Sequence, residues 1–294
     1  IHFILFVNLF SALKKRYLLF KLPIQKYCQY SKNVRPYFNM KKSTILFLFL
    51  KFYRLLWLAA LPILRKNRRL REGIKERTSS DHFKRADIWI QAASAGECNL
   101  AVQIVRTLYF KDCPCFQKTK KILITSTTSQ GFEILNQNLS KFNSSQYKNI
   151  SNPDNISQSI HINQITWFPF DIPDLMENVI CKVKPSIVVL LETELWPSLL
   201  SAAKKYGVKV VVINGRMSAK SHRNYTLTKW LWNKIEPYAV IAISDTDAQR
   251  FKDIFPNSIV DVMPNIKFDS IIPNSEEQNT VYAADISNII SEDE

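Results

Sequence analysis

The chain has 294 residues, of which 46% are hydrophobic, and a formal net charge of +15 at pH 7. It can therefore bury a full core in one or two domains, and its charge favours anionic partners such as phosphorylated substrates, nucleic acid or an acidic membrane surface. The glycines are too few and too far apart for a GxGxxG motif or a phosphate-binding loop, which argues against the usual complete nucleotide-binding folds.

The cysteines do not form a disulfide pattern. There are five of them at irregular spacing, so we expect a reducing compartment. Cys113 and Cys115 could supply half of a soft-metal site, but no second pair at zinc-like spacing completes it. A loop is the favoured interpretation, and no metal is expected.

The N-terminal part is apolar and then basic. Residues 1–39 have no clear period, and because Met40 begins a more regular pattern, we expect residues 1–39 to be an upstream extension without a part in the fold. From Ser43 to Leu64 the chain is apolar except for Lys51, Tyr53 and Arg54, and a run of cations follows. In a spanning helix each central cation would cost about 2.5–3.5 kcal/mol.

Residues 40–85 are therefore predicted to be a membrane-associating helix that lies in the interface, with a basic segment against an anionic leaflet. An N-terminal signal anchor remains the alternative. A cleavable secretory signal is disfavoured, because the apolar stretch is long and interrupted and has no small-residue cleavage site.

From residue 86 onward, strand and helix patterns alternate. Strands are predicted at 88–90, 121–125, up to 167, 186–191, 208–213, 240–243 and 259–263, with helices at 100–110, 132–139, 175–183, 199–206, 226–235 and 245–255. This spacing predicts an α/β fold with a doubly wound, Rossmann-like parallel sheet over residues 86–270. The Asn- and Ser-rich residues 136–164 are predicted to be a disordered insertion, and residues 271–294 an unpatterned acidic tail.

Polar side chains gather directly after the predicted strands. Because the carboxyl ends of parallel strands lie at one edge of a sheet, we expect these groups to meet in one crevice that binds a polar substrate. The segments are Ser94 to Glu97, Thr125 to Gln130, Asp171, Glu192 to Glu194, and Asn214 to Arg216 with Ser218.

Glu97 follows a turn at Gly96 and opens a helix, whose N-terminus stabilises a carboxylate. Taken alone, this stretch favours a helix-start glutamate without a chemical role. Asp171 is predicted to be the N-cap of the helix that follows it.

The segment after the fourth predicted strand, 186–191, carries two acids. Glu194 is predicted to cap the helix that starts at Pro197. Glu192 directly follows five apolar residues and is therefore the acid expected to be partly buried, with Arg216 or Lys267 as a partner.

Together these segments resemble the 3-deoxy-D-manno-octulosonic acid (Kdo) transferase family, which acts in lipopolysaccharide synthesis. The resemblance extends from about Leu55 to Asp269, and its uncommon motifs are hard to attribute to chance. In the family's order the matching motifs are Ala93-Ser94-Ala95-Gly96-Glu97, Thr125 to Gly131, Phe168-Pro169-Phe170-Asp171-Ile172-Pro173, Glu192-Thr193-Glu194-Leu195-Trp196-Pro197, Asn214-Gly215-Arg216-Met217-Ser218 with Ser221 and Tyr225, and Asn265-Ile266-Lys267-Phe268-Asp269.

The resemblance implies the N-terminal, acceptor-binding half of a GT-B glycosyltransferase at the cytoplasmic face of the inner membrane. It implies inverting transfer of Kdo from CMP-Kdo to a lipid A precursor (lipid IVA), without a metal or other cofactor. Glu97 matches the family's general base and Glu192 its second important acid. Substrate-binding roles fall on Ser94, Gly96, Thr128, Asp171, Glu194, Asn214, Arg216, Ser218 and Lys267.

The resemblance covers one half of the family's pattern. The family's donor-binding half is not matched, so we expect transfer to require a half that this chain lacks. Smaller departures are Ala95, Cys98 and Gly215. The alternative is a non-catalytic membrane-surface module that binds an anionic glycolipid in the same crevice. Nucleic-acid binding is disfavoured, because the cations concentrate beside the apolar segment.

Overall fold

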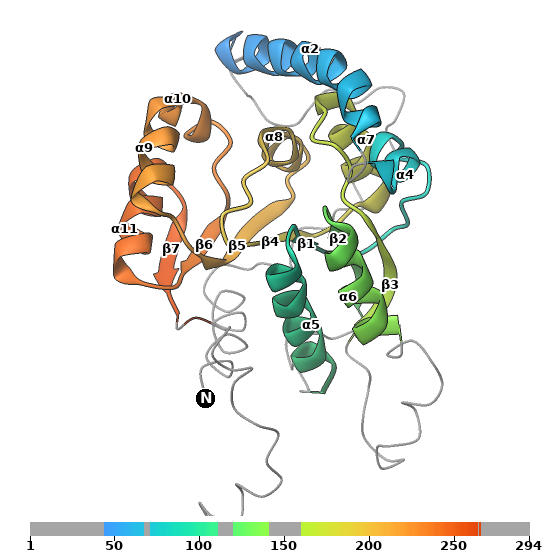
Figure 1. The fold of residues 1–294 in the computed structure, drawn as a ribbon. Coiled ribbons are helices and arrows are strands. Elements are labelled where there is room, and N and C mark those ends of the chain that lie inside the picture. The colour runs from blue at the N-terminus through green and yellow to red at the C-terminus, as the bar shows by residue number, and fades with distance from the viewer. Residues whose placement is uncertain (1–43, 68–70, 111–119, 141–159, 264, 266–294) are drawn as a thin grey trace, which may run out of the picture.

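The computed structural model describes residues 44–67, 71–110, 120–140, 160–263 and 265. These residues form a seven-stranded parallel sheet in the order β3-β2-β1-β4-β5-β6-β7, with helices on both faces (Figure 1). The predicted doubly wound sheet is therefore confirmed. Its strands are β1 (Ile88–Ala92), β2 (Lys120–Ser126), β3 (Ile160–Trp167), β4 (Ile187–Leu191), β5 (Lys209–Gly215), β6 (Ala239–Ala242) and β7 (Ile259–Val262).

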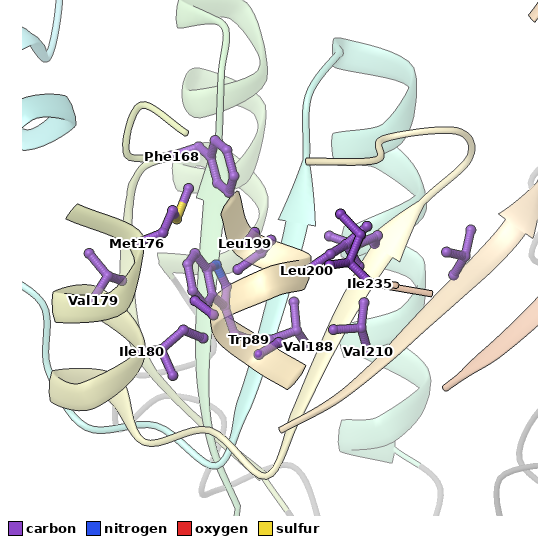
Figure 2. Packing of buried hydrophobic residues seen from close by; sticks show 14 of the residues in the cluster. Trp89, Phe168, Met176, Val179, Ile180, Val188, Leu199, Leu200, Val210 and Ile235 are labelled. Carbon is purple, nitrogen blue, oxygen red and sulfur yellow. The ribbon is translucent and has the colours of Figure 1, made fainter. Parts of the chain in front are cut away.

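The central strands are buried on both faces, which is why they form a parallel sheet between two helical layers. Every residue of β1 and of β4 is buried. One face packs on α5 (Ala95–Phe110) and α6 (Ser129–Leu139), and the other on α7 (Pro173–Val183), α8 (Pro197–Lys205), α10 (Lys229–Trp232) and α11 (Asp245–Ile254). Figure 2 shows the second core, in which Trp89 of β1 lies among Phe168, Met176, Val188 and Leu199.

The strand order reverses between β1 and β4. The chain winds outward from β1 to β3, returns to β4 beside β1, and winds outward again to β7. β1 and β4 pair from Ile88↔Ile187 to Gln91↔Leu190, so their carboxyl ends are level. The chain then leaves β1 toward one face and β4 toward the other. Open α/β sheets bind ligands at such a switch point.

Helix α2 (Thr44–Lys66) lies along the outside of the α7–α8 layer (Figure 1). By length and composition it could cross a membrane. One side nevertheless packs on the domain: Leu46 is buried, the Trp57 ring lies 5.3 Å from Phe170, and Arg54 pairs with Asp174 at 3.0 Å. The other side exposes a row of apolar side chains, namely Ile45, Phe47, Leu48, Phe52, Leu55, Leu56, Leu58 and Ile63.

Both bounds of the predicted disordered insertion, 136–164, are wrong. Helix α6 continues to Leu139, and β3 begins at Ile160. β3 is an edge strand, and its amide side chains bond to backbone atoms: Asn163 donates to Arg85 O at 2.8 Å, and Gln164 accepts from Lys84 N at 2.9 Å. A polar edge strand therefore has the composition of a disordered segment. Residues 141–159, like 1–39 and 271–294, lie outside the described residues.

Two helical predictions also differ. The helix predicted at 226–235 begins earlier and is divided into α9 (Ala219–Leu227) and α10. It begins at residue 219 because Ser218 caps it, accepting the Ser221 N–H at 3.1 Å. The basic segment also contains a short helix that the pattern did not predict, α4 (Ile74–Thr78).

Candidate functional site

Glu97 lies in the first turn of α5, directly after β1. It is 5% exposed. Its Oε2 accepts the backbone N–H of Ala93 at 2.6 Å and its Oε1 accepts the Ser94 hydroxyl at 3.1 Å, while the Ser94 hydroxyl oxygen accepts the Glu97 N–H at 3.3 Å. This is a variant of the capping box. The helix-start role is therefore present, and the same bonds hold the carboxylate in one orientation.

The environment of Glu97 makes its carboxylate more basic than a free one. Burial raises its pKa, the bonds from Ala93 and Ser94 oppose this rise, and the charge of Glu192 adds to it. A raised pKa strengthens a carboxylate as a proton acceptor near neutral pH. The interaction also places Glu97 and Glu192 near each other, although they follow different strands, β1 and β4.

The loop between β4 and α8 carries the other two acids. Glu192 has a left-handed backbone (φ 57°), and its N–H donates to Ile213 O of β5 at 3.0 Å. Glu194 is half-buried. Burial raises its pKa to about 7, with further contributions from the charges of Glu97 and Glu192, and the nearby Trp196 indole opposes the rise. The charges of Glu97 and Glu192 therefore favour the protonated form of Glu194.

We call Glu97, Glu192 and Glu194 the acid cluster. It stands where the strand order reverses, between the loops that follow β1 and β4. Tyr225 of α9 borders it, because the charge of Glu194 adds to burial in raising the pKa of this phenol. Within the described part of the chain, no group of three or more His, Cys, Asp or Glu side chains is placed to hold a metal ion.

Two predicted caps are wrong. Asp171 is fully buried, and its carboxylate accepts the N–H groups of Ser198 and Leu199, each at 2.9 Å, in the first turn of α8. It therefore caps α8 from 27 residues away, where Glu194 was predicted. The helix that follows Asp171 has Ile172 at its N-cap without a side-chain bond. Burial raises the pKa of Asp171 to about 7 against these bonds.

Two predicted substrate-binding hydroxyls cap helices. Thr128 accepts the Gly131 N–H at 3.1 Å at the start of α6, and Ser218 makes the corresponding bond at the start of α9. Both residues remain exposed to solvent while their hydroxyl groups cap these helices. Because each starts a helix at the carboxyl end of a strand, both lie at the edge of the sheet that holds the acid cluster.

The remaining predicted residues differ in exposure. Asn214 is buried with φ 57°, whereas Arg216 is exposed. The Thr193 hydroxyl donates a hydrogen bond to the backbone carbonyl of Arg216. Gly96 is exposed in the first turn of α5. Lys267 lies outside the described residues. The loops after β4 and β5 are thus joined beside the acid cluster.

One buried cation was missed from the sequence. Arg77 is 2% exposed, and its guanidinium donates to Thr127 O at 2.7 Å and to Glu72 O at 3.2 Å, and lies 4.4 Å from the Trp167 ring. Burial lowers its pKa to about 10. Arg77 thereby fixes the loop after β2 to α4. Nothing in its local sequence distinguishes it from the surface cations beside it.

Comparison with known proteins gives a consistent result. The family model described as 3-deoxy-D-manno-octulosonic-acid transferase (kdotransferase) matches residues 67–270. A bifunctional glycosyltransferase/methyltransferase of Fusobacterium nucleatum is 29% identical over 184 residues, which are 61% of this chain and 25% of that protein. The 3-deoxy-D-manno-octulosonic acid transferase of Bordetella pertussis is 27% identical over 198 residues, which are 65% of this chain and 40% of that protein.

These relatives are longer than the chain, which spans between a quarter and two fifths of their length. Among solved structures, UDP-GlcNAc 2-epimerase from Neisseria meningitidis, bound to UDP-GlcNAc, has 18% identity and a TM-score of 0.39, over 70% of this chain and 51% of that one. A score this low supports no argument about the site. The family match covers more than half of the chain and includes every loop of the acid cluster, and the chain belongs to the Kdo transferase family.

Proposed function

We propose that this chain is the acceptor-binding half of a Kdo transferase of lipopolysaccharide synthesis, and that Glu97 is the general base of the transfer. The observation that carries the proposal is a buried, oriented carboxylate with a raised pKa at the switch point of the sheet, beside a second acid. Membership of the family supports the same chemistry.

In the proposed reaction, Glu97 takes the proton of an acceptor hydroxyl as that oxygen attacks the anomeric carbon of Kdo. The bond from this carbon to the CMP phosphate breaks, and CMP leaves with the electron pair, which inverts the anomeric centre. Each Glu97 oxygen accepts one hydrogen bond from the protein and has a second lone pair for the proton. A placed general base contributes about 10²–10⁴-fold to the rate.

The other polar groups at this edge are proposed to hold the acceptor. Glu192 orients the hydroxyl or the base, and exposed Arg216 meets an acceptor phosphate. Ser94, Gly96, Thr128, Asn214, Ser218, Glu194 and Lys267 keep the substrate-binding roles that the resemblance implies. Asp171 does not, because its carboxylate is enclosed and bonded to α8.

The donor CMP-Kdo is proposed to bind a second GT-B half, which would correspond to the part of the longer relatives that this chain does not match. The acceptor is a lipid, and α2 fits a membrane-bound substrate. We propose that its exposed apolar side enters the cytoplasmic face of the inner membrane, with Lys51, Arg65 and Lys66 near anionic headgroups. A spanning arrangement would separate the packed side of α2 from α7.

A chimera tests the catalytic proposal. Residues 1–270 are joined to the donor-binding part of the Bordetella pertussis relative, and binding of CMP-Kdo and of vesicles containing lipid IVA verifies both halves. We expect Kdo transfer to lipid IVA, and at least a 100-fold lower kcat in Glu97→Gln. The matched control, Glu133→Gln, changes an exposed acid of α6 and should retain full activity.

Two results would contradict the proposal. Transfer that survives Glu97→Gln would remove the general base. A chimera that binds both ligands and transfers nothing would favour the alternative, a non-catalytic module that holds an anionic glycolipid at the membrane surface.

A further inference from the structure

The Asp171 carboxylate connects α2 to α8. Its Oδ2 accepts the Tyr53 hydroxyl of α2 at 3.2 Å and the Ser198 N–H at 2.9 Å, and its Oδ1 accepts the Leu199 N–H at 2.9 Å. The Ser198 hydroxyl also donates to the Asp171 carbonyl at 2.6 Å. One buried side chain therefore joins the outermost helix to the first turn of α8.

Aromatic contacts hold the Tyr53 hydroxyl in place. The Phe49 and Tyr53 rings stack with centroids 5.7 Å apart, the Tyr53 and Trp57 rings meet edge to face at 6.3 Å, and Trp57 lies 5.3 Å from Phe170, next to Asp171. These rings form the side of α2 that packs on the domain. The hydroxyl reaches Asp171 only while this side of α2 is seated.

The first turn of α8 continues directly from the loop that carries two members of the acid cluster. The loop begins at Glu192, whose N–H bonds to β5, and ends at Trp196, the residue before α8, whose ring lies 5.0 Å from Phe168. Glu194 lies between these two fixed points. The position of its carboxyl group therefore depends on where α8 starts.

We propose that Tyr53 and Asp171 are positioning residues for the acid cluster, which hold the Glu192–Trp196 loop through the first turn of α8 and so keep Glu194 beside Glu97. Helix α2 is then part of the site as well as a membrane attachment, and its displacement from the domain loosens the loop. The link to catalysis rests on the proposed function, whereas the link from α2 to α8 does not.

The charge state of Asp171 gives the test its readout. The groups that bond to this carboxyl are the Tyr53 hydroxyl from α2 and the amides of α8, and the half-exposed pair Arg54–Asp174 lies between α2 and α7. Burial raises the pKa of Asp171, whereas the hydrogen bonds from the Tyr53 hydroxyl and from the Ser198 and Leu199 amides lower it. Removal of the Tyr53 hydroxyl must therefore raise this pKa further, which a purely packing role of the ring would not do.

The experiment measures amide hydrogen exchange at Ser198 and Leu199 by NMR in the full chain from pH 6 to 9. In Tyr53→Phe, which keeps the ring, we expect protection of both amides to fall about tenfold at pH 8, because a hydrogen bond to a charged group is lost. We also expect the pH at which protection is half lost to move upward. The control Phe52→Leu changes the neighbouring residue on the exposed side and should leave both values unchanged.

Unchanged protection together with an unchanged pH midpoint in Tyr53→Phe would overturn the proposal. In the chimera, Tyr53→Phe should lower kcat at least fivefold while binding to vesicles is retained, and a normal kcat would overturn the link to the acid cluster. If exchange responds as expected but the wild-type chimera transfers nothing, the positioning of α8 stands and the proposed function fails.

Discussion

Replacement of Glu194 by Gln is expected to stabilise the protein above pH 7. Its pKa is raised from 4.5 to about 7, first by burial and then by the charges of Glu97 and Glu192. Each pH unit in this interval corresponds to about 1.4 kcal/mol. The ionised side chain therefore costs the native state up to about 3 kcal/mol relative to the unfolded chain, and Gln removes the charge at nearly constant volume.

The sign of this effect follows from proton binding. Between pH 4.5 and 7 the native state holds more protons at Glu194 than the unfolded state does, so the free energy of unfolding falls as the pH rises. Below pH 4.5 both states are protonated, and the variant should match the wild type. The advantage of Glu194→Gln should then increase across the interval and level off above pH 7.

Urea unfolding of the full chain at half-unit steps from pH 4.5 to 8.5 measures this difference. Glu133→Gln, at an exposed position of α6, is the matched control and should stay within about 0.5 kcal/mol of the wild type at every pH. A Glu194→Gln advantage that does not grow with pH, or a variant less stable than the wild type at pH 8, would refute the reasoning. The three acids would then not share one enclosed region.

Two further predictions concern packing and the membrane. Gly73→Ala should lower the free energy of unfolding by at least about 2 kcal/mol more than Gly207→Ala does, as measured by urea unfolding. Both glycines have φ near +68°, but a Cβ at Gly73 would lie 2.2 Å from Trp167, whereas a Cβ at Gly207 would meet nothing within 4 Å. Equal losses of stability would contradict this contact. Phe47→Ser should weaken binding to anionic vesicles about tenfold in sedimentation assays. The reason is that the exposed Phe47 side chain would contribute about 1.5–3 kcal/mol to binding when it enters an apolar phase. Unchanged binding would show that this side of α2 does not face lipid.

The sequence by itself determined the layered sheet. Continuous apolar runs such as Ile187–Leu191 can only be buried between two helical layers, and their alternation with helical patterns fixes a parallel sheet. It also placed Glu97 and Glu192 directly after strands, where an open sheet binds ligands. The end of β3 at Trp167 was predicted, but its polar first part was assigned to the disordered insertion, because a strand with one open edge needs no apolar run.

Only the tertiary structure decided which polar groups meet. Asp171 caps a helix 27 residues away and accepts a hydroxyl from 118 residues away, whereas the local pattern pointed to the helix beside it. The burial of Arg77 and the raised pKa of Glu194 were likewise not predicted from the sequence. Periodicity reports the few neighbouring residues that share a helix or strand face, but hydrogen bonds and desolvation depend on which distant elements pack together, and these set the charge of each site residue.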